Sequence, residues 1–223
     1  INNFAKKHDL WVLDDAAQSF GSQFDNKPVG SLCEVTATSF FPAKPLGCYG
    51  DGGAIFTNND KYAEKVKMMR VHGQNKRYQH KYLGMGGRLD TIQAAVLLAK
   101  LPHYKKELEG REYVAKYYTN SLTGSLKIPV IKLNRSSVWA QYTIRLDYRD
   151  KVQTKLTNSG IPTSVHYPVP LHLQECFQYL NYKVKDFPIV EEVSNCVLSL
   201  PMNAYLSESD ISLIAKVVNE ANI

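Results

Sequence analysis

Residues 39–53 read Ser39-Phe40-Phe41-Pro42-Ala43-Lys44-Pro45-Leu46-Gly47-Cys48-Tyr49-Gly50-Asp51-Gly52-Gly53. Lys44 follows apolar residues and precedes a run rich in glycine, which is typical of an amine held in a shaped pocket. Burial disfavours the ammonium form and lowers a lysine pKa, and a neutral amine is the form that reacts with a carbonyl compound. Most lysines lie exposed instead, so this interpretation of Lys44 needs a second feature to support it.

A pair of acidic residues upstream supplies that feature. Asp14 and Asp15 follow the apolar run 11–13, and Ala16-Ala17-Gln18 comes next. A carboxylate at the end of a buried strand stays ionised when it faces a cation such as the protonated ring nitrogen of pyridoxal 5′-phosphate. At about 4 Å and an effective dielectric constant near 20, that pairing contributes roughly 4 kcal/mol before desolvation. It also keeps the ring an electron sink. The alternative is a strand-end carboxylate that caps a helix.

The first third of the chain alternates helical and extended patterns. Apolar spacing predicts helices over 1–8 and 60–70, the second of them capped by Asn59. Short apolar runs predict strands over 11–13, 36–40 and 53–57. Short strands separated by helices and loops indicate an α/β unit with a mostly parallel sheet. Functional groups then belong at the carboxyl ends of strands, where Asp15 and Lys44 lie.

A different pattern begins at Asp90. Asp90 and Gln93 have the spacing of a capping pair, which predicts a helix that runs to Leu101. Pro102 bends or ends that helix, because proline removes a backbone donor and clashes with the preceding turn. A second helix is predicted over 104–121.

The last hundred or so residues have a different order of predicted helices and strands, which indicates a smaller domain. Beyond Gly124 the apolar pattern predicts a strand, a helix, an extended segment and a closing helix, over 138–146, 151–159, 161–167 and from Ser207 to 221. We therefore predict two domains. A large α/β domain spans 1–121, and a smaller C-terminal α+β domain spans 122–223.

Composition excludes several classes of protein. The chain has 223 residues, of which 44% are hydrophobic, enough for a core of ordinary size. No apolar run is long enough to cross a bilayer and no signal peptide is visible, so we expect no membrane partner. Four widely spaced cysteines without a C-x-x-C pair argue against a zinc site and a disulfide framework. We expect no metal ion and a cytoplasmic location.

The charge balance is compatible with anionic ligands. A net charge of +6 fits small anionic substrates as well as nucleic acid. Residues 76–82 combine basic and aromatic side chains as some nucleic-acid binders do. No signature of a nucleic-acid module accompanies them, so we expect no nucleic-acid partner and interpret this stretch as a mobile loop over an anionic ligand.

These motifs resemble a known family. Four stretches carry the likeness, namely Asp14 to Gly21, Thr38 to Gly53, Arg88 to Ala95 and Gly160 to Pro168. They are similar to the DegT/DnrJ/EryC1/StrS family of nucleotide-sugar aminotransferases, and the likeness covers the whole chain. Within the family, the chain most resembles enzymes that aminate C3 of UDP-2-acetamido-2-deoxy-3-keto-hexuronic acid. Members that aminate C4 typically read Thr-Gly-Glu-Gly-Gly, where this chain reads Tyr49 to Gly53.

The resemblance implies roles for the residues that match the cofactor site. Lys44 would form the Schiff base with pyridoxal 5′-phosphate and then move the proton between substrate and cofactor. Asp15 would pair with the ring nitrogen, Gln18 would lie against the ring, and Ser39 would donate to the phosphate. Gly86 stands where relatives usually carry an asparagine that reaches the phosphate of the neighbouring subunit, so backbone or water would make that contact here.

The resemblance also implies a substrate and an assembly. Arg88, His166 and Tyr167 match positions that contact the sugar nucleotide, and an arginine binds a uronate carboxylate bidentately. His166 has the alternative of a packed core histidine. The implied activity is transamination of a nucleotide-linked ketosugar by L-glutamate for O-antigen and lipopolysaccharide sugars. Relatives are homodimers with shared active sites.

The implied fold is the type I aminotransferase fold, with the N-terminal portion of its large domain expected to be absent from this chain. Two other functions stay open. One is a cofactor-dependent sugar dehydratase, although such relatives usually replace the lysine by histidine. The other is a truncated, non-catalytic binding or dimerisation remnant.

Overall fold

The computed structural model describes residues 1–222, which form two compact units. Unit 1 comprises Ile1–Leu108 with Ile131–Ala140, and unit 2 comprises Glu109–Val130 with Gln141–Ile223. The units divide inside the long helix α4 (Tyr104–Ser121). The expected domain boundary between residues 121 and 122 falls at the end of that helix, and it stays a prediction.

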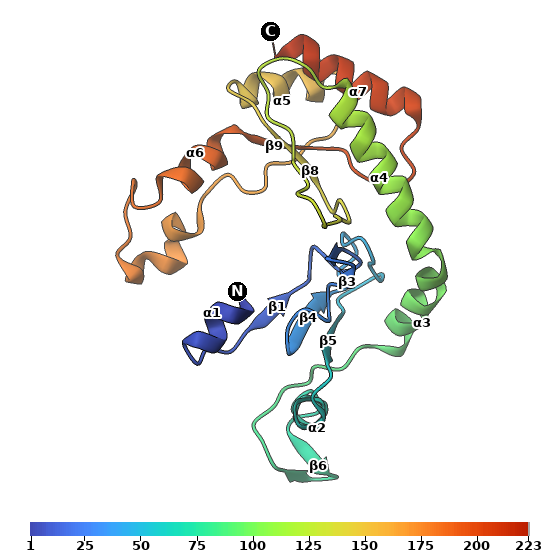
Figure 1. The fold of residues 1–223 in the computed structure, drawn as a ribbon, viewed down its shortest axis with the longest axis vertical. Helices are drawn as coiled ribbons and strands as arrows, with labels where there is room; N and C mark the ends of the chain where they lie inside the picture. The colour runs from blue at the N-terminus through green and yellow to red at the C-terminus, as the bar shows by residue number, and fades with distance from the viewer. Residues whose placement is uncertain (223) are drawn as a thin grey trace. The chain divides into compact units, whose positions relative to one another are not determined.

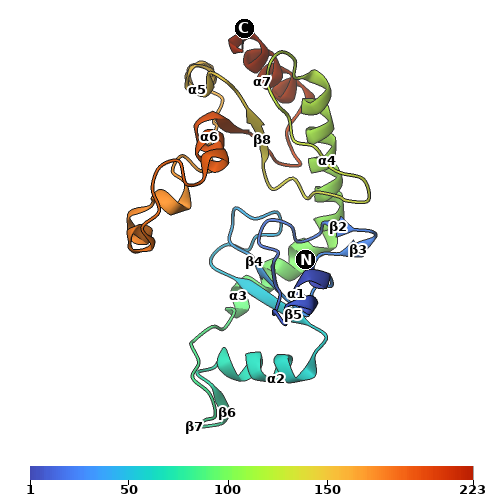
Figure 2. The same cartoon turned by 60° about the vertical axis from the view of Figure 1, so that its left-hand side comes forward.

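A three-stranded sheet organises unit 1 (Figures 1 and 2). In the spatial order β1-β4-β5, its strands are Leu13–Asp15, Val35–Ser39 and Gly53–Thr57. β1 and β4 run parallel, with Asp15 opposite Ala37, whereas β4 and β5 run antiparallel, with Ser39 opposite Gly53. Among residues 1–222, the expected parallel pairing is limited to β1 and β4. Residues 40–52 join β4 to β5 as a loop, without the crossover helix that a parallel neighbour requires.

The helices of unit 1 lie where the sequence predicts them. α1 (Asn2–Lys7) precedes the sheet, and α2 (Asp60–Met69) follows it. Asn59 caps α2 as predicted, because its side chain accepts hydrogen bonds from the backbone N–H groups of Lys61 and Tyr62. Local side-chain chemistry therefore sets the start of this helix.

Two short antiparallel hairpins complete the strands of unit 1. One pairs β2 (Gln23–Phe24) with β3 (Lys27–Pro28), and the other pairs β6 (Gln74–Lys76) with β7 (Gln79–His80). Both views place α2 between β5 and the β6–β7 hairpin (Figures 1 and 2). The basic and aromatic stretch 76–82 thus forms part of a hairpin.

Helix α3 (Thr91–Lys100) completes unit 1 and packs on the loop that carries Lys44. Its Leu97 belongs to a buried cluster with Phe40, Leu46, Cys48 and Tyr104. Pro102 ends α3 as predicted, since the 3-10 turn η1 (Leu101–His103) follows and α4 begins directly after it. Phe40 before Lys44, and Leu46 and Cys48 after it, are therefore part of the hydrophobic core of this unit.

Unit 2 contains a two-stranded antiparallel sheet with helices. β8 (Tyr142–Arg145) lies inside the predicted strand 138–146 and pairs with β9 (Val197–Leu200), a strand that the sequence analysis did not predict. The fully buried side chains of this unit come from the sheet, from α4 and from the helices α5 (Arg149–Asn158) and α7 (Glu208–Ala221), and include Tyr118, Ile144, Leu156, Leu198 and Ile211. Ser207 and Asp210 form the capping box that opens α7, so this predicted helix start is confirmed.

The segment between α5 and α6 (Pro188–Cys196) is mostly irregular. Residues 161–167, expected to be extended, make one isolated bridge from Ser164 to Ser199. Two 3-10 helices, η2 (Leu171–Leu173) and η3 (Glu175–Leu180), then lead to α6. Among residues 1–222, none of the helices combines the length and the apolar character needed to cross a bilayer.

Candidate functional site

Asp15 lies at the carboxyl end of β1, as predicted. Its side chain is exposed, and its Oδ1 accepts a hydrogen bond of 3.0 Å from the Ala17 backbone N–H. Beside it, the Ala16 N–H donates to the Ala37 carbonyl at 2.7 Å, which ties the turn after β1 to β4. No basic side chain among residues 1–222 forms an ion pair with Asp15. This carboxylate can therefore accept a cationic ligand atom.

Ser39 is the last residue of β4 and Lys44 lies in the loop that follows it, at the same edge of the sheet as Asp15. The Ser39 Oγ accepts a hydrogen bond of 3.2 Å from the Phe41 N–H, which leaves its hydroxyl proton free to donate. The Lys44 N–H donates to the Phe41 carbonyl at 2.9 Å and closes a turn. Within the described residues, no side chain pairs with the Lys44 amine.

The burial around Lys44 differs from the sequence-based expectation. Lys44 is half-buried, but Phe41 is 51% exposed, and Pro42 and Ala43 are exposed as well. The buried part of the loop follows the lysine, from Pro45 to Cys48. Burial thus comes from packing on α3, and the apolar residues directly before Lys44 do not enclose it within the described chain.

Glycines allow the loop to close tightly. A Cβ on Gly47 would lie 2.7 Å from the Pro42 carbonyl oxygen and 2.8 Å from that of Phe41. A Cβ on Gly53 would lie 2.7 Å from the Thr38 carbonyl oxygen in the neighbouring strand. These distances are shorter than any real Cβ contact, so both positions require glycine in this conformation.

Three further predicted residues lie in unit 1 at positions open to solvent. Gln18 is exposed in the turn that follows β1, and Arg88 is exposed just before α3. Gly86 forms a bridge to Val71, and a Cβ there would lie 3.2 Å from the His72 ring. The asparagine that the resemblance implies at position 86 would need this ring to shift, which gives a local reason for glycine.

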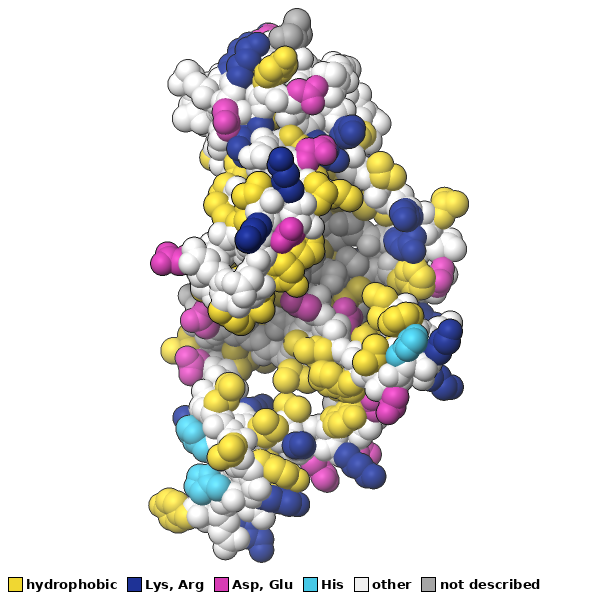
Figure 3. Space-filling model, turned by 90° about the vertical axis from the view of Figure 1, so that its left-hand side faces the viewer, with side chains coloured by type: hydrophobic (Ala, Val, Ile, Leu, Met, Phe, Trp, Pro, Cys, Tyr) yellow, Lys and Arg dark blue, Asp and Glu magenta, His cyan; other side chains and the backbone are white. Residues whose placement is uncertain are grey.

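The β6–β7 hairpin and the residues after it expose apolar and basic groups. Tyr78, Leu83 and Met85 are 78%, 95% and 70% exposed. Figure 3 shows histidine and basic side chains beside apolar ones at the lower end of the molecule, which carries this hairpin. The interpretation of 76–82 as a loop over an anionic ligand stays a prediction.

A cavity in unit 1 lies on the sheet rather than at Lys44. It has a volume of about 610 Å³ and opens between β4, β5 and α2, with Phe40, Ile55 and Val66 in its lining. Neither Asp15 nor Lys44 lines it. The candidate site therefore rests on the edge of the sheet and its loop, and not on this cavity.

His166 and Tyr167 lie in unit 2. The His166 Nδ1 is 3.0 Å from the Ser199 Oγ, which fixes the half-buried ring on β9. Tyr167 is 69% exposed. Both residues line a cavity of about 490 Å³ whose walls are mostly apolar side chains from 168–171 and α6. The structure thus brings these two predicted residues together within their own unit.

Sequence reasoning misassigned Gln93. The expected capping pair does not form, because α3 begins after Asp90 without a side-chain capping bond. The Gln93 Oε1 instead accepts a hydrogen bond of 2.8 Å from the backbone N–H of Tyr49. No signal in the sequence places residue 93 beside residue 49, because this contact depends on how α3 packs on the loop.

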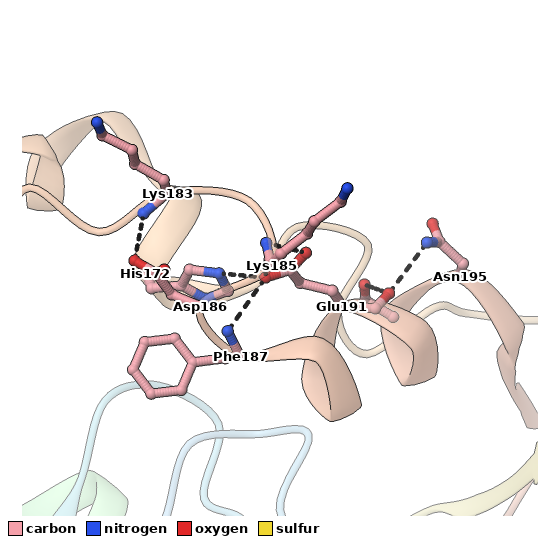
Figure 4. Close-up of polar contacts among 8 residues, drawn as sticks. His172, Lys183, Lys185, Asp186, Phe187, Glu191 and Asn195 are labelled. Carbon is pink, nitrogen blue, oxygen red and sulfur yellow. Dashed lines mark hydrogen bonds and ion pairs between the residues drawn. The ribbon is translucent and has the colours of Figure 1, made fainter.

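A carboxylate in unit 2 holds the segment before α6 in place (Figure 4). Glu191 accepts hydrogen bonds from the backbone N–H groups of Lys185 and Phe187, and the His172 Nε2 lies 3.0 Å from its Oε1. The His172 ring also packs against Phe187, with ring centroids 4.8 Å apart. The hydrogen bond from Lys185, followed by that from His172, lowers the pKa of Glu191 below its ordinary 4.5, although desolvation opposes the shift.

We expect this network to weaken in acid. A carboxyl whose pKa is lower in the folded than in the unfolded state stabilises the fold above 4.5, and this contribution is lost as the pH falls through the folded-state pKa. In an NMR titration, the amide resonances of Lys185 and Phe187 should therefore shift with a midpoint below 4.5. Glu191→Gln should abolish that titration, whereas Glu175→Gln, at an exposed position, should leave it unchanged. A midpoint at or above 4.5 would contradict the assignment.

Comparison with known proteins places the chain. A sequence profile of the DegT/DnrJ/EryC1/StrS aminotransferase family matches residues 1–219. The chain is 46% identical over 215 residues to UDP-2-acetamido-2-deoxy-3-oxo-D-glucuronate aminotransferase from Pseudomonas aeruginosa, which covers 96% of this chain and 59% of that protein.

Two crystal structures share the fold. A DegT DnrJ EryC1 StrS aminotransferase from Brucella abortus is 40% identical, with a TM-score of 0.94 over 99% of this chain and 60% of that one. S. venezuelae DesV, solved in complex with a ketimine intermediate, is 34% identical, with a TM-score of 0.95 over 98% of this chain and 60% of that one. The α/β fold predicted from the resemblance, that of a PLP-dependent aminotransferase, is confirmed by these likenesses. The chain spans about three fifths of the length of these relatives. It belongs to the DegT/DnrJ/EryC1/StrS aminotransferase family.

Proposed function

We propose that this chain belongs to a pyridoxal 5′-phosphate-dependent aminotransferase that acts on a nucleotide-linked ketosugar, with L-glutamate as the amino donor. One observation carries the proposal. A carboxylate at the end of β1 and an amine in the loop after β4 lie at one edge of the sheet, and within residues 1–222 neither forms an ion pair. Such a donor set fits a ligand that has both a cationic ring nitrogen and an aldehyde.

In this proposal, each of these residues would meet one group of the cofactor. Asp15 would hold the proton on the ring nitrogen, because an adjacent carboxylate favours the charged form of the ring. Ser39 would donate its free hydroxyl proton to the phosphate, and Gln18 would lie against the ring. Near Gly86, a backbone group would take the place of the asparagine amide. When bound, the cofactor supplies an electron sink that makes a carbon–hydrogen bond of the substrate acidic.

Lys44 has two tasks in the proposed reaction. Its amine would hold the cofactor covalently when no substrate is present. Once released, the Lys44 Nζ would take the proton from the carbon of the amino donor and later deliver one to the sugar carbon, which sets the new stereocentre. The same side chain would thus carry the proton in both steps. The backbone turn that Lys44 forms with Phe41 fixes where this side chain begins.

We propose the substrate from residues and relatives together. Arg88 is exposed and can bind a carboxylate bidentately, as a uronic acid substrate requires. His166 and Tyr167 would contact the nucleotide-linked sugar. The similarity to an enzyme named for a 3-oxo-glucuronate substrate favours a UDP-linked 3-keto-hexuronic acid derivative and therefore sugars of the O-antigen and lipopolysaccharide type. A cytoplasmic homodimer with shared sites completes the proposal.

The amino donor and the reaction type can be tested in one assay. The protein loaded with pyridoxal 5′-phosphate is mixed with L-glutamate and no sugar. We expect the visible band of the bound aldehyde form to disappear and one equivalent of 2-oxoglutarate to be released per site. D-Glutamate serves as the matched control and should leave the spectrum unchanged. Loss of the band without release of 2-oxoglutarate would contradict transamination with L-glutamate as the amino donor.

A further inference from the structure

The loop that carries Lys44 is held from outside by one face of α3. Gln93 and Lys100 are about two helical turns apart, so their side chains leave the same face of the helix. Both reach the return arm of the loop, residues 47–50. Neither Gln93 nor Lys100 has a role in the proposed reaction itself.

Gln93 fixes the far end of that arm. Its Oε1 accepts a hydrogen bond of 2.8 Å from the Tyr49 N–H, a backbone group that would otherwise be left to water. Its amide nitrogen also packs on the next residue, since a Cβ on Gly50 would lie 2.8 Å from the Gln93 Nε2. The Gln93 side chain is half-buried. Hydrogen bond and packing together define where the chain turns at Tyr49 and Gly50.

Lys100 fixes the near end. Its Nζ donates to the Gly47 carbonyl at 2.6 Å and lies 5.2 Å from the centroid of the Tyr49 ring. The charge-assisted bond is of the stronger kind, and the cation–π contact uses the same ammonium. Lys100 thereby contacts both ends of the return arm from one position.

The remainder of the loop closes on itself. The Phe40 N–H donates to the Gly52 carbonyl at 2.7 Å, and the Cys48 N–H donates to the Phe40 carbonyl at 2.8 Å. Phe40, Leu46 and Cys48 pack with Leu97 of α3 in one buried cluster. Lys44 is therefore at the outer turn of a closed loop whose orientation depends on the polar contacts with α3.

We infer that Gln93 and Lys100 are positioning residues for Lys44. They hold residues 47–50, and through the closed loop they hold the Lys44 amine at the edge of the sheet at which β1 ends with Asp15. This inference rests on the proposed function, because it gives the pair a role in presenting the amine to pyridoxal 5′-phosphate. The two residues contact the backbone of the loop and not the reacting atoms.

The test measures the Lys44 amine and the Tyr49 amide separately. To measure labelling of Lys44, the protein is incubated with pyridoxal 5′-phosphate and reduced with borohydride, and the labelled peptides are quantified by mass analysis. Opening of the hydrogen bond at the Tyr49 amide is measured by the rate of hydrogen exchange in the absence of cofactor. For Gln93→Leu we expect about tenfold slower labelling and about tenfold faster exchange, the size of effect that one lost hydrogen bond produces. Gln93→Glu keeps an acceptor oxygen and should restore both rates to within about threefold of the unaltered protein.

Lys100 is tested in the same way with matched controls. Lys100→Met keeps the length of the stem and removes the donor, so Lys44 labelling should fall about fivefold to tenfold. Lys106→Met and Gln178→Leu change exposed residues whose side chains form no hydrogen bond or ion pair within residues 1–222, and should alter neither rate. Thermal unfolding of each variant is measured to check that the folded fraction is equal at the assay temperature.

The outcomes separate this inference from the proposed function. If the unaltered protein takes no label at Lys44, the proposed function fails and the positioning role fails with it. If the unaltered protein is labelled and Gln93→Leu is labelled equally fast, the inference alone is overturned. It is also overturned if Gln93→Glu is no better than Gln93→Leu, because a general loss of packing would then explain both variants.

Discussion

Lys44→Ala should abolish covalent attachment of pyridoxal 5′-phosphate and lower the rate of transamination by about 10³-fold, within the range for loss of a general acid–base group. The reason is that, in the proposed reaction, one amine would both hold the cofactor and move the proton. Methyl in place of the aminobutyl side chain can do neither. Borohydride reduction and peptide mapping measure the first task, and release of 2-oxoglutarate from L-glutamate measures the second.

A matched control is available on α4. Lys106 is exposed and forms no ion pair within the described residues, so Lys106→Ala should keep both the label and the rate. Fold integrity should be unaffected in both variants, because the Lys44 side chain makes no polar contact within residues 1–222. A Lys44→Ala protein that still incorporates the label at another residue of the loop, with its rate preserved, would overturn the assignment of the amine.

The location of Asp15 and of the Lys44 loop could be predicted from the sequence, because Asp15 ends one short strand and the loop follows the end of another. That rule is local, and the structure places Asp15 and the Lys44 loop at one edge of the sheet as the rule requires. The helix starts at Asn59 and Ser207 were predictable for the same reason, since a capping side chain acts on backbone groups next to it in the chain.

Features that depend on distant partners could not be predicted. The direction of β5 is set by how residues 40–52 fold back, and strand patterning does not distinguish parallel from antiparallel pairing. Asp90 and Gln93 have capping-box spacing, but Gln93 finds a partner in Tyr49, which is remote in sequence. The buried side of the Lys44 loop was likewise misjudged, because packing on α3 and not local hydrophobicity decides which side is covered.

Gly47→Ala should destabilise the protein by about 1–3 kcal/mol, the usual penalty for forcing an extra methyl group into a packed site. The two oxygens that the methyl group would meet belong to the backbone of Phe41 and Pro42, so no side-chain rotation relieves the clash. The loop must open, and Lys44 moves with it. Urea unfolding measures the stability, and the labelling rate of Lys44 should fall in the same variant.

The sign of the change in stability distinguishes a steric clash in the folded state from the entropic effect that replacing glycine has on the unfolded chain. Where space is free, Gly→Ala commonly stabilises a protein by about 0.4–1 kcal/mol, because it restricts the unfolded chain. Gly87 provides that comparison, since its Cβ would make ordinary contacts with the flexible Met85 side chain at 3.4 and 3.6 Å. Gly87→Ala should therefore be neutral or slightly stabilising while Gly47→Ala is destabilising. Equal changes in both variants would mean that residue 47 is not enclosed as described, and the closed loop around Lys44 would have to be abandoned.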